Sequence, residues 1–154
     1  IVNTSYGSVE VKGTTFNVKA YSNEPLQATL VTGSVLVSDK ESEKEALLQP
    51  GQQANVVNKQ INVSNVETDL FTSWKDGKLI FRKEYLPTAA KRIERWYNVI
   101  IELDDDKRLN DIWFSGVLEM ESFSEVLELL KVTSPIDYTY NEKTRTIKIK
   151  YSEN

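Results

Sequence analysis

The sequence predicts an α+β protein in which an all-β N-terminal domain is followed by a small domain built from two β-α-β units. Two observations support this fold class. Up to about Val66, the chain consists of short, β-branched, mostly alternating segments. After Asp69, strand and helix patterns alternate, and the core positions of one β-α-β stretch recur 37 residues later. We therefore expect domains over 1–68 and 78–154, joined by a connecting helix over 69–77.

The N-terminal domain is predicted from its strands and from the turns between them. Turn-forming residues occupy 22–25, 49–52 and 58–59, and they separate the apolar alternating segments. We expect stacked or meandering antiparallel strands, with at most a short polar helical turn in the charged stretch 39–48. The predicted strands are Gly7–Val11, Thr15–Tyr21, Ala28–Ser38, Ala54–Val57 and Ile61–Val66.

The connecting segment has the start and stop signals of a short helix. Asp69 is a candidate N-cap, and Gly77 is a residue type that commonly follows a helix end. We place the boundary between the two domains at this segment.

The C-terminal domain is predicted as two β-α-β units and a closing strand. Pro87 suits the first turn of the first helix, and Ser122 with Glu125 matches the capping box that opens the second. The first unit comprises a strand over 78–81, a helix over 86–98 and a strand over 99–103. The second comprises a strand over 111–120, a helix over 122–132 and a strand over 136–140, before a last strand over 146–151.

The two units share one register of core residues. Each apolar position of the first unit finds an apolar or aromatic residue 37 positions later, through strand, helix and strand. Each unit should therefore bury one helix stripe against one sheet face. The matched pairs are Phe81 with Leu118, Leu86 with Phe123, Ala90 with Leu127, Ile93 with Leu130, Val99 with Ile136, and Ile101 with Tyr138.

The composition excludes several classes of function. The chain of 154 residues has no cysteine and no histidine, which excludes the usual zinc sites, thiol nucleophiles and histidine-based triads. Its net charge of −4 argues against nucleic-acid binding. No apolar run approaches the roughly 20 residues that cross a bilayer. We expect no cofactor and no metal. Ile1 is not a natural start and indicates a fragment of a longer protein, which leaves open a targeting or membrane segment upstream.

Acidic and aromatic pairs are the remaining candidate sites. Glu119 and Glu121 share a strand face, as a glycosidase pair could, but a solvated face explains them better. The acidic run at 104–106 lacks the residue order of a calcium loop and is most simply a solvated turn. Two aromatic pairs, Trp96 with Tyr97 and Trp113 with Phe114, are candidate partner-binding residues. The alternative is that helices or the β-domain cover both faces.

Two motifs resemble a known family. The stretches GTTFNVKAY (13–21) and LQPGQQA (48–54), followed by the doubled β-α-β pattern, are similar to the FecR family of anti-sigma factors in the form common in Bacteroidetes. The similarity extends over nearly the whole chain. The C-terminal pattern also resembles the secretin and TonB short N-terminal domain. The resemblance implies that the β-domain over 1–68 is incomplete at its N-terminus.

The resemblance implies a regulatory function. Such proteins hold an extracytoplasmic-function sigma factor through an N-terminal segment, which this chain lacks, and cross the inner membrane once. Their periplasmic part receives a signal from the N-terminal signalling domain of a TonB-dependent outer-membrane transducer, and so regulates genes such as those for iron or glycan uptake. The alternative is a carbohydrate-binding or other ligand-binding module of the envelope, with tryptophans as a stacking platform.

The resemblance also singles out the Gly13-Thr14 bond. Some members of the family cleave themselves at a Gly-Thr bond, where the threonine hydroxyl attacks the preceding carbonyl and the ester then hydrolyses. Gly13 tolerates a strained backbone and Thr14 supplies a hydroxyl. The simpler interpretation is a β-bulge at Gly13 with a cross-strand hydrogen bond from Thr14. Apart from this possible self-cleavage, we expect no enzyme.

Overall fold

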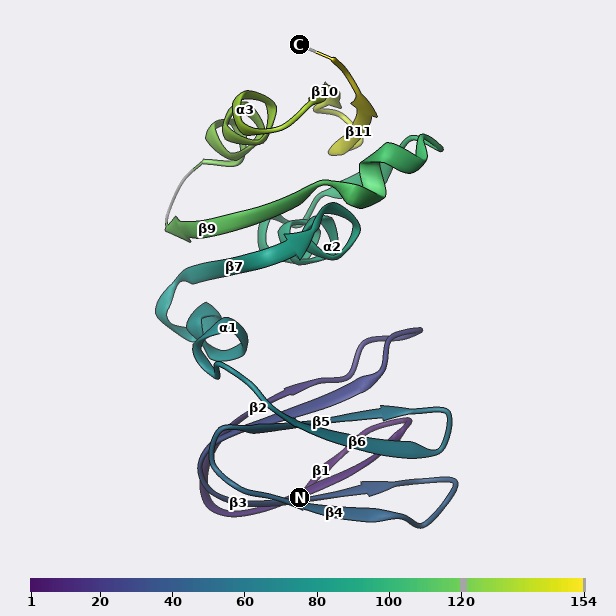
Figure 1. Cartoon of the computed structure of the whole chain (residues 1–154), viewed down its shortest axis with the longest axis vertical. Helices are drawn as coiled ribbons and strands as arrows, with labels where there is room; N and C mark the ends of the chain where they lie inside the picture. Colours follow the sequence, from purple (N-terminus) through teal and green to yellow (C-terminus); the bar gives the residue numbers. More distant parts are fainter. Residues whose placement is uncertain (120–121, 154) are drawn as a thin grey trace. The chain divides into compact units, whose positions relative to one another are not determined.

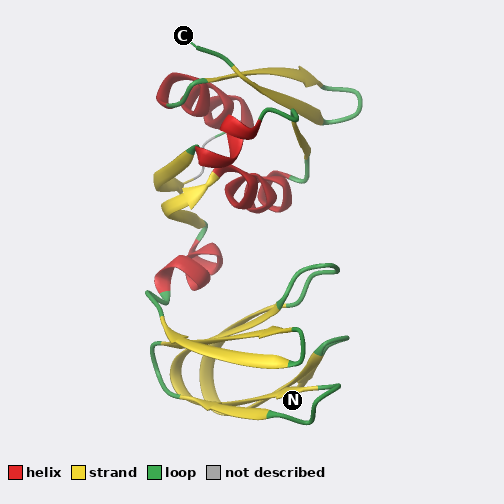
Figure 2. Ribbon diagram, turned by 45° about the vertical axis from the view of Figure 1, so that its right-hand side comes forward, coloured by secondary structure: helices red, strands yellow, loops and turns green. Residues whose placement is uncertain are grey.

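The computed structural model describes residues 1–119 and 122–153, which form two compact units over 1–76 and 77–154. Unit 1 is a sheet with one short helical segment at its C-terminal end, whereas unit 2 combines helices with short sheets (Figures 1 and 2). The predicted mixed α+β fold is therefore confirmed at the level of its class. The boundary between the units falls within the segment predicted as the connecting helix.

Unit 1 is an antiparallel sheet with the strand order β1-β2-β3-β5-β6, and β4 pairs with the other half of β3. Asn58 and Lys59 both have positive φ, as in the tight turns that join hairpin strands. The strands are β1 (Val2–Asn3), β2 (Gly7–Lys19), β3 (Leu26–Asp39), β4 (Glu45–Leu48), β5 (Gln52–Val57) and β6 (Gln60–Asn65).

Unit 1 differs from the sequence analysis in two places. The charged stretch 39–48, where at most a short polar helical turn was expected, has a turn over 40–42 and then a strand that was not predicted, β4. Ala46 and Leu48 alternate with exposed residues and pair with β3, where Leu48 becomes buried. The strands expected over 7–11 and 15–21 form the single strand β2. A register shift near Gly13, whose φ is 59°, accommodates the glycine without ending the strand.

The end of unit 1 is helical. Helix α1 (Asp69–Thr72) continues into a 3-10 turn over Ser73–Asp76, and Gly77 follows with a φ of 75°. Asp69 is the first helical residue and not the cap, a position that Thr68 occupies without a side-chain hydrogen bond. Within this unit, the indole nitrogen of Trp74 donates to Asn17 Oδ1 at 2.9 Å.

Unit 2 follows the predicted order of elements. Strand β7 extends four residues beyond the predicted end, and a 3-10 helix over Lys107–Asp111 precedes β9, so that Asp111 and Ile112 lie outside the strand predicted to start there. Met120, predicted in the same strand, lies outside the described residues. The elements are β7 (Lys78–Tyr85), α2 (Leu86–Tyr97), β8 (Ile100–Leu103), β9 (Trp113–Glu119), α3 (Phe123–Thr133), β10 (Ile136–Asn141) and β11 (Thr146–Tyr151).

The two strands of each predicted β-α-β unit lie in different sheets. The first strands, β7 and β9, pair antiparallel with each other. The second strands, β8 and β10, flank β11, which is parallel to β8 and antiparallel to β10. The C-terminal strand β11 therefore lies between β8 and β10. The second strands of the two repeats do not pair with each other.

The β7–β9 ladder relates the two repeats by an internal pseudo-two-fold axis. Ile80 lies opposite Val117, the residue 37 positions later in the chain. The flanking pairs are reciprocal, since Leu79 faces Leu118 and Phe81 faces Gly116. Exchanging the two repeats therefore maps this part of the ladder onto itself, which gives the sequence periodicity a structural basis.

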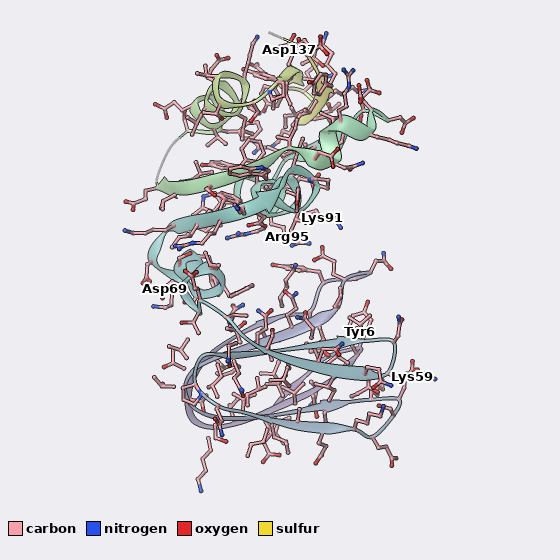
Figure 3. All side chains as sticks on the ribbon, in the orientation of Figure 1. Tyr6, Lys59, Asp69, Lys91, Arg95 and Asp137 are labelled. Atoms are coloured by element: carbon pink, nitrogen blue, oxygen red, sulfur yellow. The ribbon has the colours of Figure 1, made fainter. Side chains whose placement is uncertain are left out.

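The core of unit 2 contains the residues that the repeat pairs predicted. Leu86, Ala90, Ile93, Leu127 and Leu130 are all buried, as are the strand residues Phe81, Leu118, Val99 and Ile136. Phe123, Ile101 and Tyr138 are partly buried against the same cluster. The face of the β10–β11 hairpin that points away from this core is polar. On it, Asp137 (labelled in Figure 3) forms an ion pair with Lys131, with Oδ1 and Nζ 3.0 Å apart.

Candidate functional site: an apolar groove beside β9

An apolar groove of about 580 Å³ lies between β9 and the C-terminal half of α3. Core residues of β7 and α2, including Phe81 and Ile93, form its floor. Among the described residues that line it, Asp111 is the one that carries a charge. The groove therefore suits apolar side chains much better than it suits a charged ligand.

One edge of β9 faces this groove without a neighbouring strand. The Leu86 amide donates to the Ile112 carbonyl at 2.8 Å, so the main chain of Ile112 faces β7. Because antiparallel main-chain groups alternate in direction, Phe114, Gly116 and Leu118 also face β7. The N–H and C=O groups of Trp113, Ser115 and Val117 then point to the other edge, where no strand pairs with β9 among the described residues.

Helix α3 supplies the opposite wall and has a well-defined start. The Ser122 amide and hydroxyl both donate to Glu125 Oε2, at 2.7 and 2.8 Å, and the Glu125 amide donates back to the Ser122 hydroxyl. The predicted capping box is therefore confirmed. These hydrogen bonds lower the pKa of the Glu125 carboxyl, since they stabilise its charged form.

The structure separates the two aromatic pairs that the sequence singled out. Trp113 and Phe114 both line the groove, with Trp113 52% exposed and Phe114 partly buried against the core. The Lys83 ammonium lies 6.0 Å from the centroid of the Trp113 ring. Trp96 and Tyr97 pack against the core and are not part of the groove lining, and the Tyr97 ring contacts the Phe123 ring in a tilted arrangement with centroids 5.3 Å apart.

The C-terminal end of α2 is held by Arg145. The Arg145 guanidinium donates to the carbonyl oxygens of Asn98 and Tyr97, at 2.9 and 2.6 Å, and so caps the helix C-terminus. Figure 3 labels Lys91 and Arg95, which are exposed on the same helix. The exposed part of α2 is thus cationic, in contrast with the apolar groove.

Gly13 and Thr14 form the bulge of β2 in unit 1. The Thr14 hydroxyl lies 2.9 Å from the Lys12 carbonyl oxygen and 3.1 Å from the Ser34 carbonyl oxygen, and it accepts from the Lys12 amide at 3.2 Å. The contact with Ser34 joins β2 to β3. An added Cβ at Gly33 would lie only 2.9 Å from the Gly13 carbonyl oxygen, so the two strands approach closely here.

The acidic candidates have ordinary surface roles. Glu119 is exposed and pairs with Lys78 at 2.7 Å, whereas Glu121 lies outside the described residues. Asp106 accepts from the Arg108 side chain and amide, which lowers the pKa of its carboxyl. Within 1–119 and 122–153, no group of three or more acidic residues is arranged to hold a metal ion.

The comparisons with known proteins identify the class of the C-terminal part first. Residues 78–149 match the family model for the FecR C-terminal domain. Two crystal structures of a proposed anti-sigma factor from Parabacteroides distasonis ATCC 8503, at 1.65 and 2.50 Å resolution, are similar to the chain with 29% identity and TM-scores of 0.80 and 0.78. Each match covers 99% of this chain and 70% of that chain. No curated protein matches.

Together these findings support the resemblance seen in the sequence: residues 78–149 match the FecR C-terminal domain, and the chain as a whole is similar to a proposed anti-sigma factor. They support a sensor or regulatory role. None of the helices in the described part of the chain is long and apolar enough to span a membrane.

The sequence analysis identified Trp113 and Phe114 as candidate binding residues but did not predict the groove. Gly116 and Leu129, which help to form it, were not considered. The signal that could have found them is the repeat itself. At these two positions the second unit has Gly116 and Leu129 where the first has Leu79 and Arg92.

Proposed function

We propose that this protein is the periplasmic sensor region of a transmembrane anti-sigma factor. In this role it receives a signal from the N-terminal signalling domain of a TonB-dependent outer-membrane transducer and controls an extracytoplasmic-function sigma factor. Sigma binding belongs to a segment outside this chain, and membrane attachment to an upstream helix. The observation that carries the proposal is the apolar groove beside the open edge of β9, on the domain that matches the FecR C-terminal family.

The groove supports protein binding because it combines apolar area with exposed main-chain groups. Trp113 and Val117 are 52% and 48% exposed on β9, and Leu129 is 48% exposed on α3. Exposed aromatic and aliphatic side chains around a concave surface are typical of binding hot spots. Nucleic acid is a poor partner, since the acidic residue Asp111 lines the groove and the net charge of the chain is −4.

The test is a calorimetric titration of the protein with the isolated signalling domain of the transducer encoded beside it. We expect saturable one-to-one binding that Trp113→Ala weakens. Trp74→Ala is the matched control, because Trp74 is similarly exposed at 56% but belongs to unit 1. Absence of binding by the folded wild-type protein would refute the proposed partner, and equal weakening by both variants would argue against a groove-centred site.

Gly13-Thr14 is the bond at which self-cleavage would occur. Its hydroxyl contacts with Lys12 and Ser34 favour the structural role of a bulge, because the hydroxyl is engaged with main-chain carbonyls. We therefore expect intact mass spectrometry of the full-length protein to give a single uncleaved species. Two fragments separated between Gly13 and Thr14, and absent from a Thr14→Ala variant, would instead establish self-cleavage.

A further inference from the structure

The groove lies where the second repeat has no side chain at a position that the first repeat occupies with an apolar one. Leu79 of β7 is 5% exposed and packs in the core, whereas its counterpart on β9 is Gly116. A Cβ added at Gly116 would meet no atom within 4 Å. The first repeat thus closes this position with its own side chain, and the second repeat leaves room for a side chain from elsewhere.

The first repeat also covers the edge of its own strand. The Arg92 guanidinium of α2 donates to the Ile80 carbonyl oxygen at 2.9 Å, and its Cζ lies 4.7 Å from the centroid of the Phe81 ring. It also forms an ion pair with Glu84. A main-chain acceptor on the outer edge of β7 is therefore satisfied internally, and the long side chain that satisfies it obstructs the approach of another strand.

Among the described residues, the second repeat has no equivalent cover on β9. The residue 37 positions after Arg92 is Leu129, which has no hydrogen-bond donor in its side chain. The residue 37 positions after Ile80 is Val117, whose main chain faces the open edge. Leu129 and Val117 are both 48% exposed. The same place in the fold is thus protected in one repeat and available in the other.

We propose that an extended segment of the partner protein adds as a strand to the open edge of β9 and inserts an apolar side chain into the groove beside Gly116 and Leu129. This inference rests on the proposed function and specifies how the partner binds. The main-chain groups of Ser115 and Val117 are available to pair with complementary main-chain groups, which an extended strand supplies. The apolar walls require an apolar side chain, which takes the place that Leu79 has in the first repeat.

A second copy of this chain is a poorer occupant than a partner segment. If two copies paired through β9, each would bring a strand whose inward residues Phe114 and Leu118 already pack in its own core. Between them lies Gly116, which has no side chain to insert. The groove instead needs a segment whose apolar side chain is free to leave its own domain.

The experiment compares two arginine substitutions on α3. Leu129→Arg places in the second repeat the residue that protects β7 in the first. Val132→Arg is the matched control, because Val132 is 79% exposed on the same helix and does not line the groove. Binding is measured by calorimetry with the signalling domain of the neighbouring transducer. We expect Leu129→Arg to weaken binding by at least about tenfold, as loss of a hot-spot contact does, and Val132→Arg to leave it within about twofold.

Amide hydrogen exchange supplies a second, residue-level measurement on the wild-type protein. We expect the Ser115 and Val117 amides to exchange more slowly when the signalling domain binds, since these groups face the open edge. The Leu118 amide, which faces β7, should change much less. Thermal unfolding of both arginine variants checks that each remains folded.

The outcomes separate the two proposals. If the wild type binds the signalling domain, but Leu129→Arg binds equally well and Ser115 and Val117 stay unprotected, strand addition is overturned while the sensor role stands. If the folded wild type does not bind, the proposed function fails and this inference fails with it. A concentration-dependent dimer that protects the Val117 amide without any partner would overturn the partner strand in favour of self-pairing.

Discussion

The two repeats of unit 2 follow one plan but differ in how completely they are closed. The first, with β7 and α2, fills its strand-helix space with Leu79 and Arg92. The second, with β9 and α3, has Gly116 and Leu129 at the same places and retains a groove. The comparison teaches that duplication of a small β-α-β unit can separate two tasks. One copy can maximise stability, while the other keeps a strand edge and an apolar surface accessible.

The largest expected effect on the free energy of unfolding comes from the buried faces of the two helices, where the repeats have side chains of different size. Leu127 is 2% exposed and its counterpart is Ala90, which is 4% exposed. Leu127→Ala gives the second repeat the residue of the first, and it should lower the free energy of unfolding by about 2–5 kcal/mol through lost burial and a cavity. Urea denaturation measures the loss.

The reciprocal substitution is the control for this prediction. Ala90→Leu adds volume to the packed first repeat and should cost about 1–3 kcal/mol through overpacking. A stabilising Ala90→Leu would show that the first repeat also contains unfilled space, and the contrast between the repeats would then be wrong.

The next effect concerns the starts of the two helices. Tyr85 and Ser122 are 37 positions apart and both occupy N-cap positions, but only Ser122 makes a side-chain capping bond. Ser122→Ala should therefore lower the free energy of unfolding by about 1 kcal/mol. Tyr85→Ala should cost less than about 0.5 kcal/mol, since Tyr85 is exposed and caps nothing. Equal losses in urea denaturation would contradict this difference.

The sequence predicted the core of unit 2 better than its sheets. The apolar pairs at a separation of 37 residues identify the positions that become buried, because helix and strand periodicity are local properties. The assignment of β8 and β10 to the sheet of β11 depends on pairing over long distances in the chain, which no local pattern specifies. The charged residues around 41–45 similarly concealed β4, whose burial depends on its contact with β3.

The candidate site was predictable only in part. Trp113 and Phe114 stand out by residue type, but their accessibility depends on β9 having one unpaired edge, which is a property of the topology. The mismatches Leu79 with Gly116 and Arg92 with Leu129 can be seen in the aligned repeats. Their meaning becomes clear only when the Arg92 contact with Ile80 shows what the first repeat protects.

A smaller effect should follow from filling the groove with a side chain of the protein's own. Gly116→Leu introduces leucine, the residue type that the first repeat has at the equivalent position, Leu79. It removes a glycine from a strand and adds apolar burial, so the free energy of unfolding should rise by about 0.5–1 kcal/mol. Gly13→Ala is the control, because its Cβ would also meet open space but its φ is 59°. That variant should lose stability, and a loss in Gly116→Leu as well would indicate that the groove is not free.

The last effect is on the pH dependence of stability, in which the second strands of the two repeats should differ. Tyr138 has Ile101 as its counterpart, and its hydroxyl donates to Glu128 Oε1 at 2.6 Å. This hydrogen bond, with a further contribution from burial, raises the pKa of Tyr138 to about 12 from an ordinary value of 10.0. The unfolded chain therefore releases this proton at lower pH than the folded protein does. The stabilisation is complete below about pH 10 and is lost as the pH rises toward about 12.

Tyr138→Phe tests this pH dependence, because phenylalanine has no proton to release and, like Ile101, no hydrogen bond to make. Urea denaturation at about pH 9 and about pH 11 should show a smaller loss of stability in the variant than in the wild type. The Lys131 ammonium lies 5.9 Å from the Tyr138 ring, and Lys131 pairs with Asp137 in both proteins, so lysine deprotonation contributes to both measurements. The difference between the two proteins isolates the tyrosine. An identical loss in both would mean that the hydrogen bond to Glu128 does not hold the proton of Tyr138, and that the two repeats respond alike to alkaline pH at this position.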